Sequence, residues 1–354
     1  MSTFLTEKYR KLKPYTPGEQ PKERKYVKLN TNESPFPPSE NAVKRAREEA
    51  EKLMLYSDPE CREAGELLAK TLGVDFSNVI LTNGSDEVLN FAFMAYCDEN
   101  TPAVFADITY GFYKVFADVN NLPYREIPLT DSFEINVDDY VNAKGTVFIA
   151  NPNAPTGIAL PTSEIEKILL SDPTRIVVVD EAYVDFGADS CIPLINKYKN
   201  LIVTGTFSKS RSMAGARLGF GVASAELIDD LTRIRYSTNP YNVNRMSAAA
   251  GVGALTDKEY FENNCKKIIE NRSFTENELS ALGFEFTNSS ANFVFAKHKG
   301  ISGEKLYLEL KDRGVLVRHF TAPRIAEYNR ITIGSREEMQ ILVDKIKEIL
   351  EENK

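Results

Sequence analysis

The sequence contains no tryptophan and only two histidines, His298 and His319, among 354 residues. Two histidines are too few for a histidine-rich metal site or an obvious Ser-His-Asp triad. The four cysteines are far apart, and no two of them form a Cys-x-x-Cys pair. Neither a zinc site nor a disulfide framework is therefore indicated, and we expect no bound metal.

Positive charge is also scarce, because 43 lysines and arginines face 51 aspartates and glutamates, for a net charge of -8. Nucleic acids and anionic membranes are bound mainly by basic surfaces, so neither is an expected partner. No apolar run approaches the length of a membrane span, and residues 1–14 lack the apolar core of a signal peptide. These absences predict a cytoplasmic protein.

Strands alternate with helices through the first two thirds of the chain. The composition, 42% hydrophobic and 27% charged, suits one large core and a smaller one. Short apolar runs occur at 79–81, 103–106, 147–150, 176–179 and 201–203, and each ends in polar residues or glycine. Such alternation predicts an α/β fold with a mainly parallel sheet whose carboxyl edge carries the ligand site.

The last third has a different order. Helices are expected near 241–255 and 258–282, followed by strands at 284–287, 292–296, 315–317 and 330–333 and a helix near 304–313. Ser163-x-x-Glu166 and Ser335-x-x-Glu338 predict capping boxes at two helix starts. We therefore expect an extended arm at 1–28 that packs with the small domain or a partner subunit, a large domain at 29–255, and a small α+β domain at 256–354.

One segment carries several reactive side chains. Thr206, Ser208, Lys209 and Arg217 follow the apolar run 201–203, so they lie where a strand ends. Hydroxyl groups and an arginine suit a phosphate, and a lysine amine can attack a carbonyl group. Gly84-Ser85-Asp86 begins a helix after another strand, where free N–H groups bind phosphate, although the same residues also make an ordinary helix start.

Asp180 follows four β-branched residues, Ile176 to Val179. Its carboxylate leaves an apolar interior, which disfavours a bare charge unless a cation pairs with it. A protonated pyridine nitrogen is such a cation, and the alternative is an aspartate that caps a turn. Together with Lys209, this pattern suggests a Schiff-base lysine beside pyridoxal phosphate (PLP).

Three motifs carry a resemblance to a known family. Ser208-Lys209 with Arg217, the run Asn151-Pro152-Asn153-Ala154-Pro155-Thr156-Gly157, and Asp180-Glu181-Ala182-Tyr183 resemble those of fold-type-I, PLP-dependent aminotransferases, and more narrowly of histidinol-phosphate aminotransferases. The resemblance runs from about Tyr15 to Gly334. It implies a fold-type-I transferase, with a seven-stranded sheet flanked by helices in the large domain, and a homodimer with shared active sites.

The resemblance also implies roles for individual residues. The catalytic group would be Lys209, which anchors PLP and moves a proton, Asp180 at the ring nitrogen and Tyr183 at the phenolic oxygen. Further cofactor-binding residues would be Gly84, Ser85, Asp86, Tyr110, Asn151, Asn153, Thr206, Ser208, Arg217 and, from the neighbouring subunit, Tyr56. Substrate would be bound by Tyr15, Asn32, Arg318 and Arg330.

The sequence departs from the family pattern at Ala154, where most relatives have a second asparagine that contacts the phenolic oxygen. Asn151 or Asn153 could supply an amide from a nearby position, or Tyr183 could act alone. The sequence leaves these alternatives open.

The implied reaction transfers an amino group from histidinol phosphate to 2-oxoglutarate, giving imidazole acetol phosphate and glutamate in histidine biosynthesis. Spacing alone does not determine the reaction, because the outcome depends on which substrate bond stands perpendicular to the cofactor ring. A PLP-dependent decarboxylase for an amino-acid phosphate such as threonine phosphate, an aromatic amino acid aminotransferase and a non-catalytic PLP-binding protein remain the alternatives.

Overall fold

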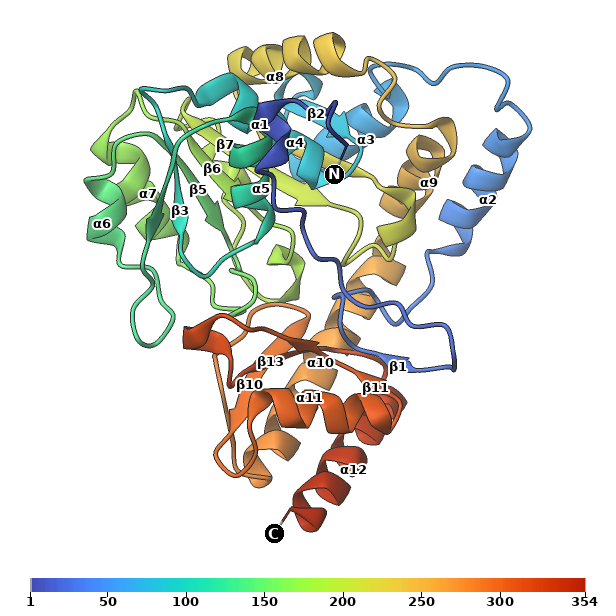
Figure 1. The fold of residues 1–354 in the computed structure, drawn as a ribbon. Helices are drawn as coiled ribbons and strands as arrows, with labels where there is room; N and C mark the ends of the chain where they lie inside the picture. Colours follow the sequence, from blue (N-terminus) through green and yellow to red (C-terminus); the bar gives the residue numbers. More distant parts are fainter. Residues whose placement is uncertain (1, 354) are drawn as a thin grey trace.

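A seven-stranded sheet forms the centre of the computed structural model, which describes residues 2–353 (Figure 1). Its strand order is β2-β8-β7-β6-β5-β3-β4, and only β8 runs antiparallel to its neighbours. The predicted mainly parallel sheet is confirmed. Its strands are β2 (Val79–Thr82), β3 (Ala103–Ala106), β4 (Tyr124–Ile127), β5 (Thr146–Ala150), β6 (Val177–Asp180), β7 (Leu201–Thr206) and β8 (Gly219–Ala223).

Helices cover both faces of this sheet. In β6, Val178 packs in a core with α4, α5 and α8, whereas Val177 and Val179 pack in a second core with α6 and α7. This division follows from the strand geometry, because successive side chains point to opposite faces. The helices of this domain are α2 (Glu40–Ala50), α3 (Arg62–Leu72), α4 (Ser85–Tyr96), α5 (Phe112–Asn120), α6 (Val137–Val141), α7 (Thr162–Ser171), α8 (Ala225–Thr238) and α9 (Arg245–Thr256).

A smaller sheet of four antiparallel strands, in the order β12-β13-β10-β9, lies below the large domain in Figure 1. Apolar side chains of this sheet and of its helices form a separate core, so the predicted small α+β architecture is present. The elements are α10 (Lys258–Ala281), β9 (Phe284–Phe286), β10 (Phe293–His298), α11 (Gly303–Asp312), β11 (Val315–Leu316), β12 (Arg318–His319), β13 (Asn329–Thr332) and α12 (Arg336–Glu352). Short 3-10 turns are η1 (Phe76–Asn78), η2 (Val184–Phe186), η3 (Ile192–Leu194), η4 (Ala214–Ala216) and η5 (Pro323–Ile325).

The amino-terminal segment crosses from the large domain to the small one (Figure 1). It contains the short helix α1 (Glu7–Arg10), and its strand β1 (Val27–Lys28) pairs in parallel with β11. Glu19 forms an ion pair with Lys311 at 2.5 Å, and the Arg24 guanidinium donates to the carbonyl oxygens of residues 311 and 312. These contacts attach the segment to the small domain, and the predicted domain limits stay a proposal.

One of the two predicted capping boxes is present. At the start of α12, the Ser335 hydroxyl accepts from the Glu338 N–H, and the Glu338 carboxylate accepts from the Ser335 N–H. The other prediction is wrong. Because α7 begins at Thr162, two residues before the start that a Ser163 cap would give, Ser163 lies inside the first turn, and the Glu166 carboxylate instead accepts from the side chains of residues 197 and 198.

Two strands of the large sheet, β4 and β8, were not located from the sequence. In β4, the side chains of Tyr124 and Arg125 are exposed at the sheet edge, so the strand has no continuous apolar run. In β8, glycines at 219 and 221 interrupt the apolar pattern. A glycine is needed at 219, because a Cβ there would overlap the backbone at the start of α4.

Candidate active site

Two adjoining cavities open at the carboxyl edge of the large sheet. The first has a volume of about 390 Å³ and is lined by residues from the start of α4 and the ends of β6 and β7; it is called the cofactor cavity because most of the residues expected to bind a cofactor line it. The second has a volume of about 500 Å³ and extends to the small domain and the amino-terminal segment; it is called the substrate cavity because the residues expected to bind substrate line it. Lys209, Tyr110, Tyr183 and Ala154 line both cavities, so the lysine lies where the two meet.

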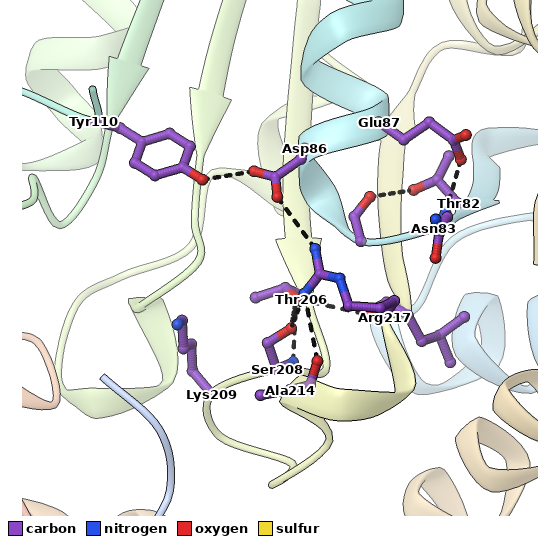
Figure 2. Close-up of polar contacts among 12 residues, drawn as sticks. Thr82, Asn83, Asp86, Glu87, Tyr110, Thr206, Ser208, Lys209, Ala214 and Arg217 are labelled. Atoms are coloured by element: carbon purple, nitrogen blue, oxygen red, sulfur yellow. Dashed lines mark hydrogen bonds and ion pairs between the residues drawn. The ribbon is translucent and has the colours of Figure 1, made fainter. Parts of the chain in front are cut away.

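Hydroxyl groups and one arginine gather at one end of the cofactor cavity (Figure 2). The Thr206 hydroxyl donates to Ser208 Oγ at 3.0 Å and accepts from the Ser208 N–H at 3.1 Å. Arg217 Nη1 lies 3.5 Å from Ser208 Oγ, and Ser85 lines the same cavity as the first residue of α4. The start of α4, the hydroxyls of Ser85 and Ser208 and the Arg217 guanidinium form a cradle suited to a phosphate.

Asp86 connects this cradle to the tyrosine above it. Its carboxylate accepts from the Tyr110 hydroxyl at 2.7 Å and pairs with Arg217 Nη2 at 3.1 Å (Figure 2). The side chains of Arg217 and Asp86 are 45% and 34% exposed, and ion pairs this accessible contribute little to stability. The guanidinium can therefore bind a phosphate without losing a strong internal partner.

Gly84 leaves the space that this arginine occupies. It precedes α4 with φ 82°, a region that favours glycine, and a Cβ there would lie 2.5 Å from Arg217 Nη2. The glycine is thus predicted to act on the cradle through the position of Arg217.

Asp180 lies deeper, at the end of β6, and its side chain is almost completely buried. It accepts hydrogen bonds from the Ala182 N–H at 3.2 Å, the Tyr113 hydroxyl at 3.2 Å and the Thr204 hydroxyl at 3.3 Å. Burial raises the pKa of Asp180 to about 6, because no cation of the described residues neutralises it. The carboxylate is therefore placed to pair with a cationic group of a ligand.

A second buried carboxyl group, Glu181, was not singled out from the sequence. It accepts from the Ser190 hydroxyl at 2.6 Å and the Cys191 N–H at 2.5 Å, and burial raises its pKa to about 7. It lines neither cavity. Tyr113 was also missed, because nothing in its local sequence indicates that it contacts an aspartate 67 residues away.

The amides of Asn151 and Asn153 hold the loop after β5 together. Asn151 exchanges two hydrogen bonds with the Leu160 backbone, at 3.0 and 2.7 Å. Asn153 Nδ2 donates to the carbonyl of residue 108 at 2.9 Å, and its Oδ1 accepts from the hydroxyl of residue 109 at 2.7 Å. Neither asparagine lines the cofactor cavity or the substrate cavity, whereas Ala154, the residue after Asn153, lines both.

All four residues expected to bind substrate line the substrate cavity: Tyr15, Asn32, Arg318 and Arg330. Arg330 Nη2 donates to the Asn30 carbonyl at 3.2 Å, and its buried Nε has no hydrogen-bond partner among residues 2–353. Arg318 donates to the carbonyls of residues 16 and 17 at 3.1 and 3.3 Å, which holds the amino-terminal segment over the cavity. Two guanidinium groups facing one cavity suit an anionic ligand.

Lys209 Nζ lies 3.4 Å from the Thr31 carbonyl and 5.8 Å from the centre of the Tyr183 ring. Thr31 was not predicted, although it stands beside Asn32 in the sequence and lines both cavities. Tyr56 lies outside both cavities, with 79% of its surface exposed, and its ring stacks on Tyr241. Its contact with a neighbouring subunit stays a prediction.

Two kinds of feature are absent from the part of the chain that the structure describes. Residues 2–353 contain no helix that is both long and apolar enough to cross a membrane. They also contain no group of His, Cys, Asp and Glu side chains arranged to hold a metal ion.

Comparison with known proteins shows which family the chain belongs to. The family model for aminotransferases of class I and II matches residues 24–346, and the chain belongs to this family. The predicted family and the predicted class of enzyme are thereby confirmed.

Within this family, the chain is similar to proteins that share one name. The chain is 46% identical over 353 residues to a protein of Brachyspira hyodysenteriae named histidinol-phosphate aminotransferase, covering 99% of each chain. It is 45% identical over 351 residues to a protein of the same name from Clostridium acetobutylicum, covering 99% of this chain and 100% of the relative. The solved structure of histidinol-phosphate aminotransferase from Sinorhizobium meliloti in complex with pyridoxal-5'-phosphate superposes with a TM-score of 0.90 over 99% of both chains. At 22% identity, this last likeness is one of fold.

Proposed function

We propose that this protein is a PLP-dependent aminotransferase that transfers the amino group of histidinol phosphate to 2-oxoglutarate. The observation that carries the proposal is the position of Lys209 at the junction of two cavities, one with a phosphate cradle and a buried aspartate, the other with two arginines. The relatives named histidinol-phosphate aminotransferase over nearly the full chain support the substrate.

The residues of the cofactor cavity fit PLP. The cradle of Ser85, Ser208 and Arg217 would hold its phosphate, and Asp180 would pair with its protonated ring nitrogen. Tyr183 would donate to the phenolic oxygen. When bound, PLP supplies an electron-withdrawing ring that stabilises negative charge at the substrate Cα.

The protein groups then divide the remaining work. The buried Asp180 carboxylate would pair with the ring nitrogen and keep that nitrogen protonated. The Lys209 amine takes the proton from the substrate Cα and returns it on the cofactor side, acting as general base and then as general acid. Tyr15 and the segment held by Arg318 cover the substrate cavity and limit the access of water.

The two arginines account for the choice of substrates. Histidinol phosphate has a phosphate and no carboxylate, whereas glutamate and 2-oxoglutarate have a distal carboxylate. We propose that Arg330, whose Nε has no partner among the described residues, binds the anionic group of both substrates. Arg318, assisted by Tyr15, would bind mainly the phosphate of histidinol phosphate.

Single-turnover spectra of the cofactor-loaded enzyme test this assignment with histidinol phosphate, histidinol, glutamate and phenylalanine as donors. Removing a buried charge partner costs about 2–5 kcal/mol, so Arg330→Ala should strongly lower the rates of both half-reactions. Arg318→Ala should slow the histidinol-phosphate half-reaction more than the glutamate one. Arg313→Ala, a change of the same type outside both cavities, should leave both rates near wild type.

Three outcomes would contradict the proposal. Equal rates for histidinol and its phosphate, or fastest conversion of phenylalanine, would exclude histidinol phosphate as the preferred donor. Release of carbon dioxide from an amino-acid phosphate without formation of glutamate would indicate a decarboxylase. PLP binding without conversion of any donor would indicate a binding protein.

We further propose that the enzyme is a cytoplasmic homodimer. The segment 53–56 has large apolar side chains that are 60–81% exposed, and Tyr241 stacks on it, so this surface would pack against a second copy. Tyr56 would then reach the phosphate of the partner's cofactor. Co-refolding inactive Lys209→Ala with a Tyr56→Ala variant should restore activity in mixed dimers, because one of their two sites is intact. No gain over the separate variants would place Tyr56 outside the partner's site.

A further inference from the structure

Tyr183 is held by a residue far from it in the sequence. Asn32 Nδ2 donates to the Tyr183 hydroxyl at 2.9 Å, and Asn32 is 1% exposed. The Asn32 backbone has φ 55°, a left-handed conformation that asparagine tolerates better than most residues. The amide is thus buried at a fixed place beside the tyrosine.

The small domain determines which way this amide faces. The Asn32 N–H donates to Thr332 Oγ1 at 2.9 Å, and the Thr332 hydroxyl donates to Asn32 Oδ1 at 3.0 Å. Asn292 Nδ2 donates to the Asn32 carbonyl at 3.1 Å. Because the single proton of Thr332 is used on Oδ1, the Asn32 NH₂ group is the one that points to Tyr183.

This orientation controls the proton of Tyr183. An amide NH₂ group can only donate, so the tyrosine oxygen accepts from Asn32 and its own proton must point elsewhere. The Tyr183 hydroxyl makes no other hydrogen bond among residues 2–353, and the residue lines both cavities. A hydroxyl that accepts one hydrogen bond also becomes a better donor of another.

We propose that Asn32 is a positioning residue: it directs the Tyr183 proton to the phenolic oxygen of the cofactor and compensates for the amide absent at Ala154. The inference rests on the proposed function. It agrees with the loop after β5, where the amides of Asn151 and Asn153 bind the backbone and leave Tyr183 as the donor. Thr332 lies two residues after Arg330 in β13, so the same strand carries a substrate arginine and orients the tyrosine.

Two single variants of the holoenzyme test this role, and combining Asn32→Ala with Tyr183→Phe shows whether the effect of Asn32 passes through Tyr183. Asn32→Ala removes the donor, and Thr332→Val replaces the orienting hydroxyl with a methyl group of similar shape. Donors to the phenolic oxygen stabilise its anion, so Asn32→Ala should raise the midpoint of the cofactor's spectral pH titration by roughly half to one pH unit. Thr332→Val should shift it less, in the same direction. In Tyr183→Phe, adding Asn32→Ala should move the midpoint by less than a third of that amount.

A second readout does not require turnover. Pyridoxamine phosphate forms no link to Lys209, and its affinity for the apoenzyme should fall roughly two- to tenfold in Asn32→Ala but little when Tyr183 is already phenylalanine. A purely structural role would lower the urea midpoint of the apoenzyme and leave the titration unchanged, which would overturn the inference. An equal shift with and without Tyr183 would also overturn it. If the wild type bound neither PLP nor pyridoxamine phosphate, the proposed function itself would fail.

Discussion

Glu181→Gln should change the pH dependence of folding without removing a hydrogen bond. Burial raises the pKa of Glu181 from its ordinary value of 4.5 to about 7. Between these two pH values the folded chain keeps a proton that the unfolded chain has lost. The contribution of this group to stability is therefore complete below pH 4.5 and is lost as pH rises through 7.

The size of the effect follows from these two values. From pH 5.5 to pH 8, the free energy of unfolding should fall by about 2 kcal/mol through Glu181 alone. Glutamine has nearly the same shape and is always neutral. Its oxygen can accept from the Cys191 N–H, and its NH₂ group can donate to the Ser190 hydroxyl. The free energy of unfolding of the variant should therefore not fall by this amount as pH rises. The variant should exceed the wild type in stability by the largest margin at pH 8.

Urea unfolding of the apoenzyme at pH 5.5, 6.5, 7.5 and 8 measures this directly. Glu166→Gln is the matched control, because Lys197 and Tyr198 hold the pKa of Glu166 below its ordinary value, outside this pH range. Parallel pH profiles for wild type and Glu181→Gln, within about 0.5 kcal/mol, would refute the reasoning, since burial would then not favour the protonated carboxyl group.

Three further predictions concern the cofactor cavity. Lys209→Ala should bind PLP without a covalent link and lose nearly all turnover; a link that borohydride still reduces onto the protein would identify another lysine as the anchor. Ala154→Asn should lower the midpoint of the spectral pH titration by adding a donor near the phenolic oxygen, and an unchanged titration would show that another group already serves there. Gly84→Ala should displace the Arg217 guanidinium and weaken PLP binding at least about tenfold in equilibrium dialysis, whereas wild-type affinity would show that the arginine is not needed for the phosphate.

Much of this enzyme could be predicted from local sequence. The apolar runs that become β2, β3, β5, β6 and β7 each bury every residue or nearly every residue, so their strands are visible without tertiary information. Polar residues directly after such runs must meet at one sheet edge, because parallel strands share their carboxyl ends. That rule by itself predicts that Asp180 and Lys209 lie in one site.

Other features depended on contacts that no local pattern encodes. The exposed edge strand β4 and the glycine-containing β8 lack an apolar run, and α7 begins at Thr162, before the serine that was expected to cap it. The local sequence gives Glu181 no feature that separates it from other residues next to Asp180. Only its packing shows that it is buried away from both cavities.

The sequence by itself determined the class of fold, the position of Lys209 after a strand and the chemical types of the residues near it in the chain. Strand periodicity and residue type are local properties. The tertiary structure decided which of those residues face the cavities. Asn151 and Asn153 have the right amides in the right motif, yet the loop backbone uses them, while Asn32, 151 residues before Tyr183, is the asparagine that reaches the tyrosine. The direction of a hydrogen bond depends on every neighbouring donor and acceptor, and those neighbours come from distant parts of the chain.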